Sequence, residues 1–337
     1  MTLRLRLAIA GFFALAASAA SAQTPVPPPV ATVLDGRLPI GAAQLPIFVS
    51  QDWSRPLPAI RRAVIVVHGY ERNAADYARH MMELGPAADT IIIAPQFLAP
   101  EDIATHRLPD AIPRWQHDAW SDGEPALGPA SLSAFDGLDA IIAKLGDRAI
   151  FANLSTVVVA GFSAGGQLVQ RYAIVGRGEG AIGRPRIALR YLVGSPSSFV
   201  YFGDVRPEPT AGCVDFGHWK YGLAGDLPPY VRAAASQGAA ALERRYATRD
   251  VVYLVGTDDN DPNHRFLDKS CAAETQGPTR LARTTAFFTI LRQRDGDILR
   301  HRMWTVAGAA HNSTKVFGSP CGRAVLFGDA NCDGEKL

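Results

Sequence analysis

The sequence lacks any apolar run long enough to cross a membrane comfortably, because polar residues interrupt every run beyond residue 22. A membrane-spanning helix needs about 20 consecutive apolar residues. An excess of charge of one sign is also absent, since the chain beyond residue 22 has 32 basic and 32 acidic residues once Arg4 and Arg6 are set aside. Balanced charge gives no electrostatic basis for binding nucleic acid or an anionic membrane. We therefore expect neither as a partner.

The first 22 residues have the layout of a cleavable secretory signal. Arg4 and Arg6 form a short basic region, an apolar run covers Leu7–Ala17, and small residues follow up to position 22. The apolar run is too short for a membrane anchor. We predict that residues 1–22 are a signal peptide, that the Pro-rich residues 23–32 form an extended linker, and that the protein is secreted or periplasmic.

The sequence has only four cysteines, and their spacing does not fit a metal site. No CxxC pair or Cys/His spacing typical of zinc is present, so we predict no metal ligand. An even number of cysteines in an exported protein favours disulfides, and four cysteines allow three pairings. We favour Cys213–Cys271 and Cys321–Cys332, since the second pair closes a short loop and would pin the C-terminus.

From about residue 33 the sequence alternates short apolar runs with helical patterns. Continuous β-branched runs are typical of strands buried on both faces, as in a parallel sheet covered by helices. The alternation predicts one α/β domain over residues 33–337, built on an open, mostly parallel central sheet flanked by helices. The expected strands are Ala63–Val67, Thr90–Ala94, Thr156–Ala160, Ile187–Val193, Val251–Val255 and Arg300–Val306. The expected helices are Ala74–Leu84, a helix capped by Ser133, Gln167–Val175, Val231–Tyr246 and Thr279–Arg294.

The most informative motif is GFSAG, which covers Gly161 to Gly165 and contains Ser163. A GxSxG motif alone is a weak signal, but this one lies between a buried strand and a helical pattern. Such a turn holds its serine in a strained conformation with the hydroxyl above the sheet edge, and the helix N-terminus favours developing negative charge. We therefore predict that Ser163 is a nucleophile.

A serine hydroxyl needs a base to remove its proton. A serine in this kind of turn is followed along the chain by an acid and then by a histidine. His311 comes just after the strand that ends near Val306, and the small residues before it would let its imidazole reach back to Ser163. His301 begins that strand, at the wrong end of the sheet. We predict that His311 is the base.

The acid should follow the strand that ends at Val255, where the sequence contains three aspartates. Asp259 stands three positions after Gly256, and its task would be to orient His311 and stabilise the charged imidazolium. Asp258 is the alternative. Asp261 precedes a proline and fits a turn better, and the three together lack the spacing of a calcium loop. His264, nearby, could support the catalytic residues, although capping its own loop fits it better.

Backbone N–H groups near Ser163 should stabilise an oxyanion. We expect one donor to be the amide of Ala164. The loop after the first buried strand should supply the second, from Tyr70 or alternatively from Glu71. His68 in this loop is expected to be structural, because a base at that position would break the order along the chain.

Together these residues resemble the α/β-hydrolase superfamily over roughly residues 60–320. The resemblance is carried by VVHGY at 66–70, GFSAGG at 161–166, GTDD at 256–259 and AGAAHN at 307–312. A closer resemblance, to secreted hydrolases of bacteria and fungi, is carried by WKYGL at 219–223, DPNHRFLDKSC at 261–271 and QG-x-x-R-x-x-R at 276–283. It supports the Cys213–Cys271 pairing. More distantly, the motif layout is similar to that of polyhydroxyalkanoate depolymerases and feruloyl esterases, which implies ester cleavage.

Two long insertions, at about residues 97–130 and 196–229, follow the carboxyl ends of strands, where open α/β sheets place their sites. Both are rich in aromatic residues. One interpretation is an apolar pocket above Ser163 lined by Trp115 and Trp120, and the other is packing within a cap. We expect Trp115 and Trp120 to bind substrate.

The function expected from these residues is cleavage of a small or polymeric carboxylic ester through an acyl-enzyme, on a Ser-His-Asp triad and without a cofactor. Two alternatives stay open. The same triad could serve a peptidase or amidase, although no extra domain that would restrict access to peptides is visible. A non-catalytic binding module could also keep the fold, although such modules usually lose a triad residue and here every role has a candidate.

Overall fold

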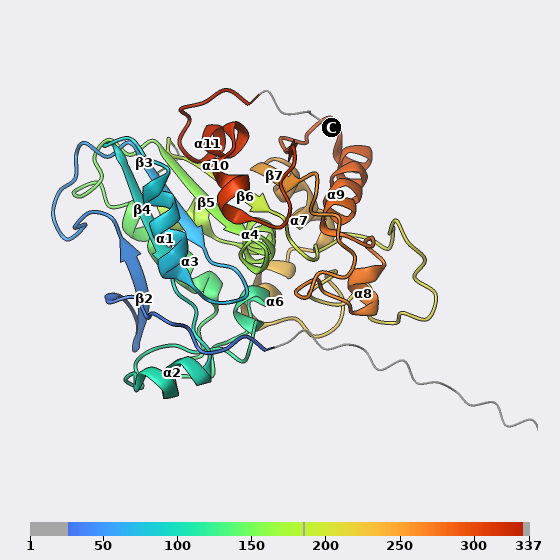
Figure 1. The fold of residues 1–337 in the computed structure, drawn as a ribbon, viewed down its shortest axis with the longest axis horizontal. Coiled ribbons are helices and arrows are strands. Elements are labelled where there is room, and N and C mark those ends of the chain that lie inside the picture. Colours follow the sequence, from blue (N-terminus) through green and yellow to red (C-terminus); the bar gives the residue numbers. More distant parts are fainter. Residues whose placement is uncertain (1–25, 185, 333–337) are drawn as a thin grey trace, which may run out of the picture.

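A computed structural model describes residues 26–184 and 186–332, and an eight-stranded sheet forms its centre (Figure 1). The strands are β1 (Gly36–Ile40), β2 (Ala43–Val49), β3 (Arg62–Val67), β4 (Thr90–Pro95), β5 (Thr156–Phe162), β6 (Ala188–Gly194), β7 (Asp250–Gly256) and β8 (Arg302–Val306). Their order in the sheet is β1-β2-β4-β3-β5-β6-β7-β8. Strands β3 to β8 are parallel to one another, while β1 and β2 add an antiparallel edge. The expected open, mostly parallel sheet is confirmed.

The sheet contains all six expected strands, with ends within two residues of those predicted. Alternate side chains of a strand enter different core clusters, as the strand period of two requires. Ile65 of β3 belongs to one cluster, whereas Val64 and Val66 belong to the other. Strands β1 and β2 were not predicted, because each sequence mixes polar and apolar residues and contains a proline.

Helices cover both faces of the sheet. The apolar residues of α1 (Ala74–Glu83), α10 (Ser313–Gly318) and α11 (Pro320–Leu326) join one core cluster, and these helices lie on the same side of the sheet (Figure 1). The other cluster takes residues from α3 (Ala134–Leu145), α4 (Ala164–Val175), α6 (Pro229–Ala235), α7 (Ala239–Ala247) and α9 (Arg280–Asp295). None of the helices in the described part of the chain is long and apolar enough to cross a membrane.

One expected helix is interrupted. The Ala-rich stretch predicted as a single helix over 231–246 forms α6 and α7, because Gly238 between them has a φ of +87° that a helix cannot accommodate. The remaining short helices are α2 (Pro100–His106), the 3-10 helix η1 (Ala119–Asp122), α5 (Gly178–Ile182) and α8 (Cys271–Glu274).

The two insertions contact each other at the carboxyl edge of the sheet. The indole N–H of Trp219 donates to the carbonyl of Asp122 at 2.8 Å. Arg171 of α4, fully buried, donates to the carboxylate of Asp122 at 2.7 Å and to the hydroxyl of Ser198 at 3.1 Å. Helix α4 therefore binds both insertions through the side chain of Arg171. The cystines are Cys213–Cys271 and Cys321–Cys332, the favoured pairing.

The described part of the Pro-rich segment lies against the domain. The buried ion pair between Arg72 and Asp102 (2.7 Å) binds it, because Arg72 donates to the carbonyl of Pro28 and Asp102 accepts the N–H of Val30. Residues 26–32 form no helix or strand. The predicted signal peptide, residues 1–22, lies outside the described residues.

The turn between β5 and α4 requires glycine for steric reasons. A Cβ on Gly165 would lie 2.4 Å from the carbonyl oxygen of His68 and 2.5 Å from that of Val67, both backbone atoms of the neighbouring β3 segment. Real Cβ atoms do not approach oxygen so closely, so a side chain here would push α4 away from the sheet. Because Gly165 has no side chain, the start of α4 can lie against β3, and this contact fixes the position of Ser163 at the N-terminus of the helix.

We predict that Gly165→Ala lowers the free energy of unfolding by about 3 kcal/mol, because the new methyl group overlaps backbone atoms that cannot move aside. Gly180→Ala in α5 is the matched control, since a Cβ there has no atom within 4 Å. It should leave the free energy of unfolding unchanged or raise it by up to about 1 kcal/mol. Urea denaturation followed by circular dichroism measures both, and equal values for the two variants would contradict the steric argument.

Candidate active site

Ser163 lies where β5 ends and α4 begins. Its φ of +59° and ψ of −121° are unusual for a residue with a side chain, and its N–H donates to the carbonyl of Gly194 at 2.9 Å. Strained backbone of this kind is concentrated at functional sites. The residue is 8% exposed and lines two cavities. The structure thus gives the predicted nucleophile the strand–turn–helix setting expected for it.

His311 and Asp259 form a direct pair on the loops after β8 and β7. The Nδ1 atom of His311 lies 2.8 Å from a carboxylate oxygen of Asp259. The imidazole also packs on Phe162, with ring centroids 4.7 Å apart, and lines the same cavity as Ser163. Of the two candidate aspartates, the structure brings Asp259 to His311, and its side chain is buried, while that of Asp258 is exposed.

A buried cation, Arg280, lies beside this pair. Burial tends to raise the pKa of Asp259, but the hydrogen bond and charge of His311 and the guanidinium of Arg280 outweigh it and lower that pKa. Arg280 is itself 1% exposed, with Nη1 3.6 Å from the Asp259 carboxylate. Burial lowers the pKa of His311 from 6.5 to about 4, against the opposing effect of Asp259. Asp259 is therefore an anion and His311 a neutral base at pH 7.

Backbone donors lie beside Ser163. Among the described residues, the N–H groups of Tyr70, Glu71 and Ala164 donate no hydrogen bond. The Tyr70 loop is held by His68, whose Nδ1 bonds the carbonyl of Gly69 at 2.9 Å and whose Nε2 accepts the N–H of Phe97. Burial lowers the pKa of His68 to about 4, so the ring is neutral and both its nitrogens are engaged. His68 has the structural setting expected for it.

Two cavities meet at Ser163. The first has a volume of about 390 Å³ and is lined by His311, His264 and the N-terminal part of α10. The second, of about 400 Å³, is also lined by Ser163, together with Ala164 and Gln167 of α4 and residues of both insertions. Tyr70 and Phe266 line both cavities, and their ring centroids lie 5.5 Å apart.

The structure corrects the expected position of two tryptophans. Trp115 and Trp120 are fully buried and line neither cavity at Ser163. They pack with Phe97, whose ring centroid lies 5.4 Å from that of Trp115 and 5.6 Å from that of Trp120. Trp120 also contacts the edge of His68. The first insertion thus turns these two indoles into the core, next to His68, while its residues His117 and Asp118 line the second cavity.

Several residues that line the cavities were not singled out from the sequence. Gln167, Lys220, Phe266 and Asp268 line the second cavity, and Phe266 also lines the first. Lys220 lies within WKYGL, and Phe266 and Asp268 lie within DPNHRFLDKSC, so the motifs marked the segments without indicating the role of any residue. His264 accepts the Phe266 N–H in its own loop at 3.2 Å and also contacts the edge of His311.

The remaining polar residues near the site do not form a metal centre. Within residues 26–184 and 186–332, no group of three His, Cys, Asp or Glu side chains is placed to hold a metal ion. Asp261 accepts the N–H of Asn263 at 2.8 Å, which is the turn-capping role expected of it.

No known protein-family model matches the sequence, and no curated protein sequence matches it. Solved structures do match the fold. Poly(aspartic acid) hydrolase-1 from Sphingomonas sp. KT-1 is 19% identical, with a TM-score of 0.60 over 88% of this chain and 99% of that one. The poly(3-hydroxybutyrate) depolymerase LpqC from Bordetella parapertussis is 19% identical, with a TM-score of 0.59 over 86% of this chain and 88% of that one.

We predict that His311 titrates with a pKa of about 4 in the folded protein, well below the ordinary histidine value of 6.5, because its burial disfavours the imidazolium. A proton NMR titration of the histidine ring signals between pH 3.5 and 8 measures this value, with the signal assigned from its loss in His311→Gln. A His311 pKa at or above 6.5 would contradict the burial argument.

Proposed function

Since the chain has the α/β-hydrolase fold, we propose that it is a secreted serine hydrolase that cleaves carboxylic esters through an acyl-enzyme. The observation that carries the proposal is the pairing of buried Asp259 with His311, which lines the same cavity as Ser163. A neutral histidine oriented by a carboxylate is the base that a serine hydroxyl needs. The neighbouring amides of Tyr70 and Ala164, which donate no hydrogen bond within the described part of the chain, are the donors that an oxyanion needs.

Acylation begins when Nε2 of His311 takes the proton of the Ser163 hydroxyl as its oxygen attacks the ester carbonyl carbon. The carbonyl π bond becomes an oxyanion, which the N–H groups of Ala164 and Tyr70 stabilise. The oxyanion then re-forms the carbonyl as the C–O bond to the leaving alcohol breaks. His311 gives its proton to that alkoxide, so the alcohol leaves neutral and the acyl group stays on Ser163.

Deacylation repeats these steps with water as the nucleophile. His311 removes a proton from water, the resulting hydroxide attacks the acyl carbonyl, and Ser163 leaves with the proton returned by His311. Asp259 holds Nδ1–H of His311 throughout and stabilises each transient imidazolium. Because Asp259 itself is fixed by Arg280, its charge stays in place as the proton moves. The products are an alcohol and a carboxylic acid, and no cofactor takes part.

The two disulfides of the protein agree with the proposal that it is secreted. Cys213–Cys271 and Cys321–Cys332 form disulfides, which persist in oxidising compartments such as the periplasm or the extracellular medium. The basic, apolar and small-residue pattern of residues 1–22 supplies a route there. We propose that the mature enzyme begins near Gln23 and acts outside the cytoplasm.

We predict that Ser163→Ala lowers kcat/KM for p-nitrophenyl butyrate by about 10⁴-fold or more, because the variant has no nucleophile to acylate. The wild-type protein should react covalently with a fluorophosphonate at Ser163, detected as a mass increase on its peptide, and His311→Ala should lose this labelling. Undiminished ester cleavage by Ser163→Ala would refute the proposal. Faster turnover of the corresponding p-nitroanilide would make the protein an amidase.

We predict that Asp259→Asn lowers kcat by about 10³- to 10⁴-fold, because an amide at this position favours the wrong tautomer of His311. Asp258→Asn is the matched control, since the Asp258 carboxylate is exposed and accepts the hydroxyl of Thr257 at 3.1 Å instead of contacting His311. Its kcat should stay within about twofold of the wild-type value. A larger loss in Asp258→Asn than in Asp259→Asn would assign the acid to Asp258.

A further inference from the structure

The turn that carries a proposed oxyanion donor is closed by Arg72. The N–H of Arg72 donates to the carbonyl of Gly69 at 3.1 Å, and Tyr70 and Glu71 lie between these two residues. Arg72 has a φ of +58°, which is unusual for a residue with a side chain, and it is 2% exposed. Strained backbone of this kind persists only where the surrounding structure holds it. The contacts of Arg72 therefore help to fix the direction of the Tyr70 N–H.

Asp102, in α2, binds the side chain of Arg72. One carboxylate oxygen accepts Nε of Arg72 at 2.7 Å, and the other accepts Nη2 at 3.1 Å. The same carboxylate accepts the N–H groups of Ala99 and Val30, each at 2.8 Å. Burial tends to raise the pKa of Asp102, but Arg72 and these two N–H groups lower it, so the carboxylate is ionised. One buried anion thus joins the turn to the N-terminal segment.

Gln96, which follows β4 and is fully buried, connects the same two parts of the chain. Its NH₂ group donates to the carbonyls of Arg72 and Thr32, both at 3.0 Å. Its oxygen accepts the N–H of Leu34 at 2.9 Å. Both Gln96 and Asp102 therefore bind Arg72 on one side and the N-terminal segment on the other.

We call residues 26–34 the N-terminal strap. The strap forms no helix or strand, and its backbone is bound by side chains of the domain instead. In addition to the contacts above, the carbonyl of Pro28 accepts Nη2 of Arg72 at 3.1 Å, and the carbonyl of Val30 bonds Nε2 of His106 at 2.7 Å. Without the strap, the oxygen of Gln96 would lose the N–H that it accepts from Leu34. A buried polar atom without a partner costs free energy, so the strap stabilises the contacts that hold Arg72.

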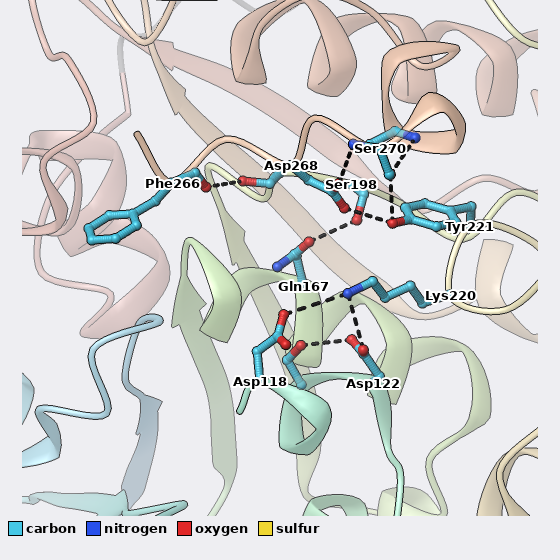
Figure 2. Close-up of polar contacts among 12 residues, drawn as sticks. Asp118, Asp122, Gln167, Ser198, Lys220, Tyr221, Phe266, Asp268 and Ser270 are labelled. Carbon is cyan, nitrogen blue, oxygen red and sulfur yellow. Dashed lines mark hydrogen bonds and ion pairs between the residues drawn. The ribbon is translucent and has the colours of Figure 1, made fainter. Parts of the chain in front are cut away.

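The strap also reaches the second cavity at Ser163. Val26, near its start, lines this cavity together with Tyr70. The cavity has polar walls that are held by contacts within the protein (Figure 2). Among them, the ammonium of Lys220 lies 3.2 Å from the carboxylate of Asp122 and 3.6 Å from that of Asp118. The strap thus meets the site at two places, the turn and the second cavity.

We propose that the Arg72–Asp102 ion pair, with the N-terminal strap bound to it, positions the turn that presents the Tyr70 N–H to the oxyanion. Arg72 and Asp102 are positioning residues, since neither lines either cavity at Ser163. The inference rests on the proposed ester hydrolysis and adds a support for its transition state. An oxyanion donor is effective because its direction is fixed before the charge develops. A looser turn should therefore slow the reaction without weakening the binding of the ester.

Asp102→Asn tests the ion pair, because it keeps the size of the side chain and removes its charge. Acylation and deacylation both pass through an oxyanion, so kcat for p-nitrophenyl butyrate should fall about 10- to 100-fold while KM stays within about twofold. Asp250→Asn is the matched control, since it breaks ion pairs with Arg190 and Arg302 at the start of β7, away from the carboxyl edge of the sheet. Its kcat should stay within about twofold of the wild-type value. A folded Asp102→Asn with wild-type kcat would overturn the role of the ion pair.

Trifluoromethyl pentyl ketone separates the positioning of a donor from a general loosening of the protein. Attack of a serine hydroxyl on this ketone gives an oxyanion adduct that resembles the transition state. The inhibition constant should therefore rise in Asp102→Asn by about the factor by which kcat/KM falls. An unchanged inhibition constant together with a lowered kcat would overturn the assignment to the oxyanion donor.

Val30 tests the strap without changing the buried charges. Val30→Pro removes the N–H that Asp102 accepts, in a segment that already contains Pro27, Pro28 and Pro29. Val30→Ala is the matched control, because it keeps this N–H and removes more of the buried side chain. We expect kcat to fall about three- to tenfold in Val30→Pro and to stay within about twofold in Val30→Ala. Equal kcat values for the two variants would overturn the role of the strap, and this comparison decides even if Asp102→Asn does not fold.

Ser163→Ala separates this inference from the proposed function. If wild-type cleavage of p-nitrophenyl butyrate depends on Ser163, and Asp102→Asn and Val30→Pro keep the wild-type kcat, the inference is wrong and the proposed hydrolase function stands. If the wild-type protein shows no cleavage that depends on Ser163, the proposed function is wrong and the inference falls with it.

Discussion

The close approach of α4 to the sheet is the constraint on which the rest of the site depends. A Cβ at Gly165 would overlap the backbone of β3, and a Cβ at Gly166 would lie 2.4 Å from the carbonyl oxygen of Gly194 in β6. With α4 fixed in this way, every residue of the helix is buried. Ser163, Gln167 and Arg171 then recur every four positions, which places them along one side of the helix.

This row of side chains contributes to three parts of the site: the proposed nucleophile, the wall of the second cavity and the contacts that position the insertions. Ser163 at its start is the proposed nucleophile, Gln167 one turn later faces the cavity, and Arg171 a further turn along binds Ser121, Asp122 and Ser198. The insertions are thus positioned from the same helix that positions the nucleophile. A shift of α4 would displace the reacting hydroxyl, the cavity and both insertions together, so the geometry of substrate binding and that of the proposed catalysis are not independent.

The sequence predicted what depends on local pattern. The parallel strands, the turn around Ser163 and the loops carrying Asp259 and His311 all follow from short stretches with clear periodicity or motif, whereas the Cys213–Cys271 pairing was supported by the resemblance to secreted hydrolases. It could not separate Asp258 from Asp259, because the two adjacent carboxylates differ in burial, which the rest of the fold decides. For the same reason Trp115 and Trp120 were expected in the cleft, and the polar walls of the second cavity, brought together from distant segments, gave no local pattern at all.

The Cys213–Cys271 cystine lies between two of these walls. Cys213 belongs to the insertion that carries Lys220 and Tyr221, while Cys271 follows Asp268 by three positions. The bond closes a segment of 58 residues, which stabilises a fold by roughly 4 kcal/mol through the entropy removed from the unfolded chain. Reduction of this disulfide would therefore free the two segments that line the second cavity from each other. The arrangement of these two segments around the second cavity therefore depends on a bond that persists in oxidising surroundings.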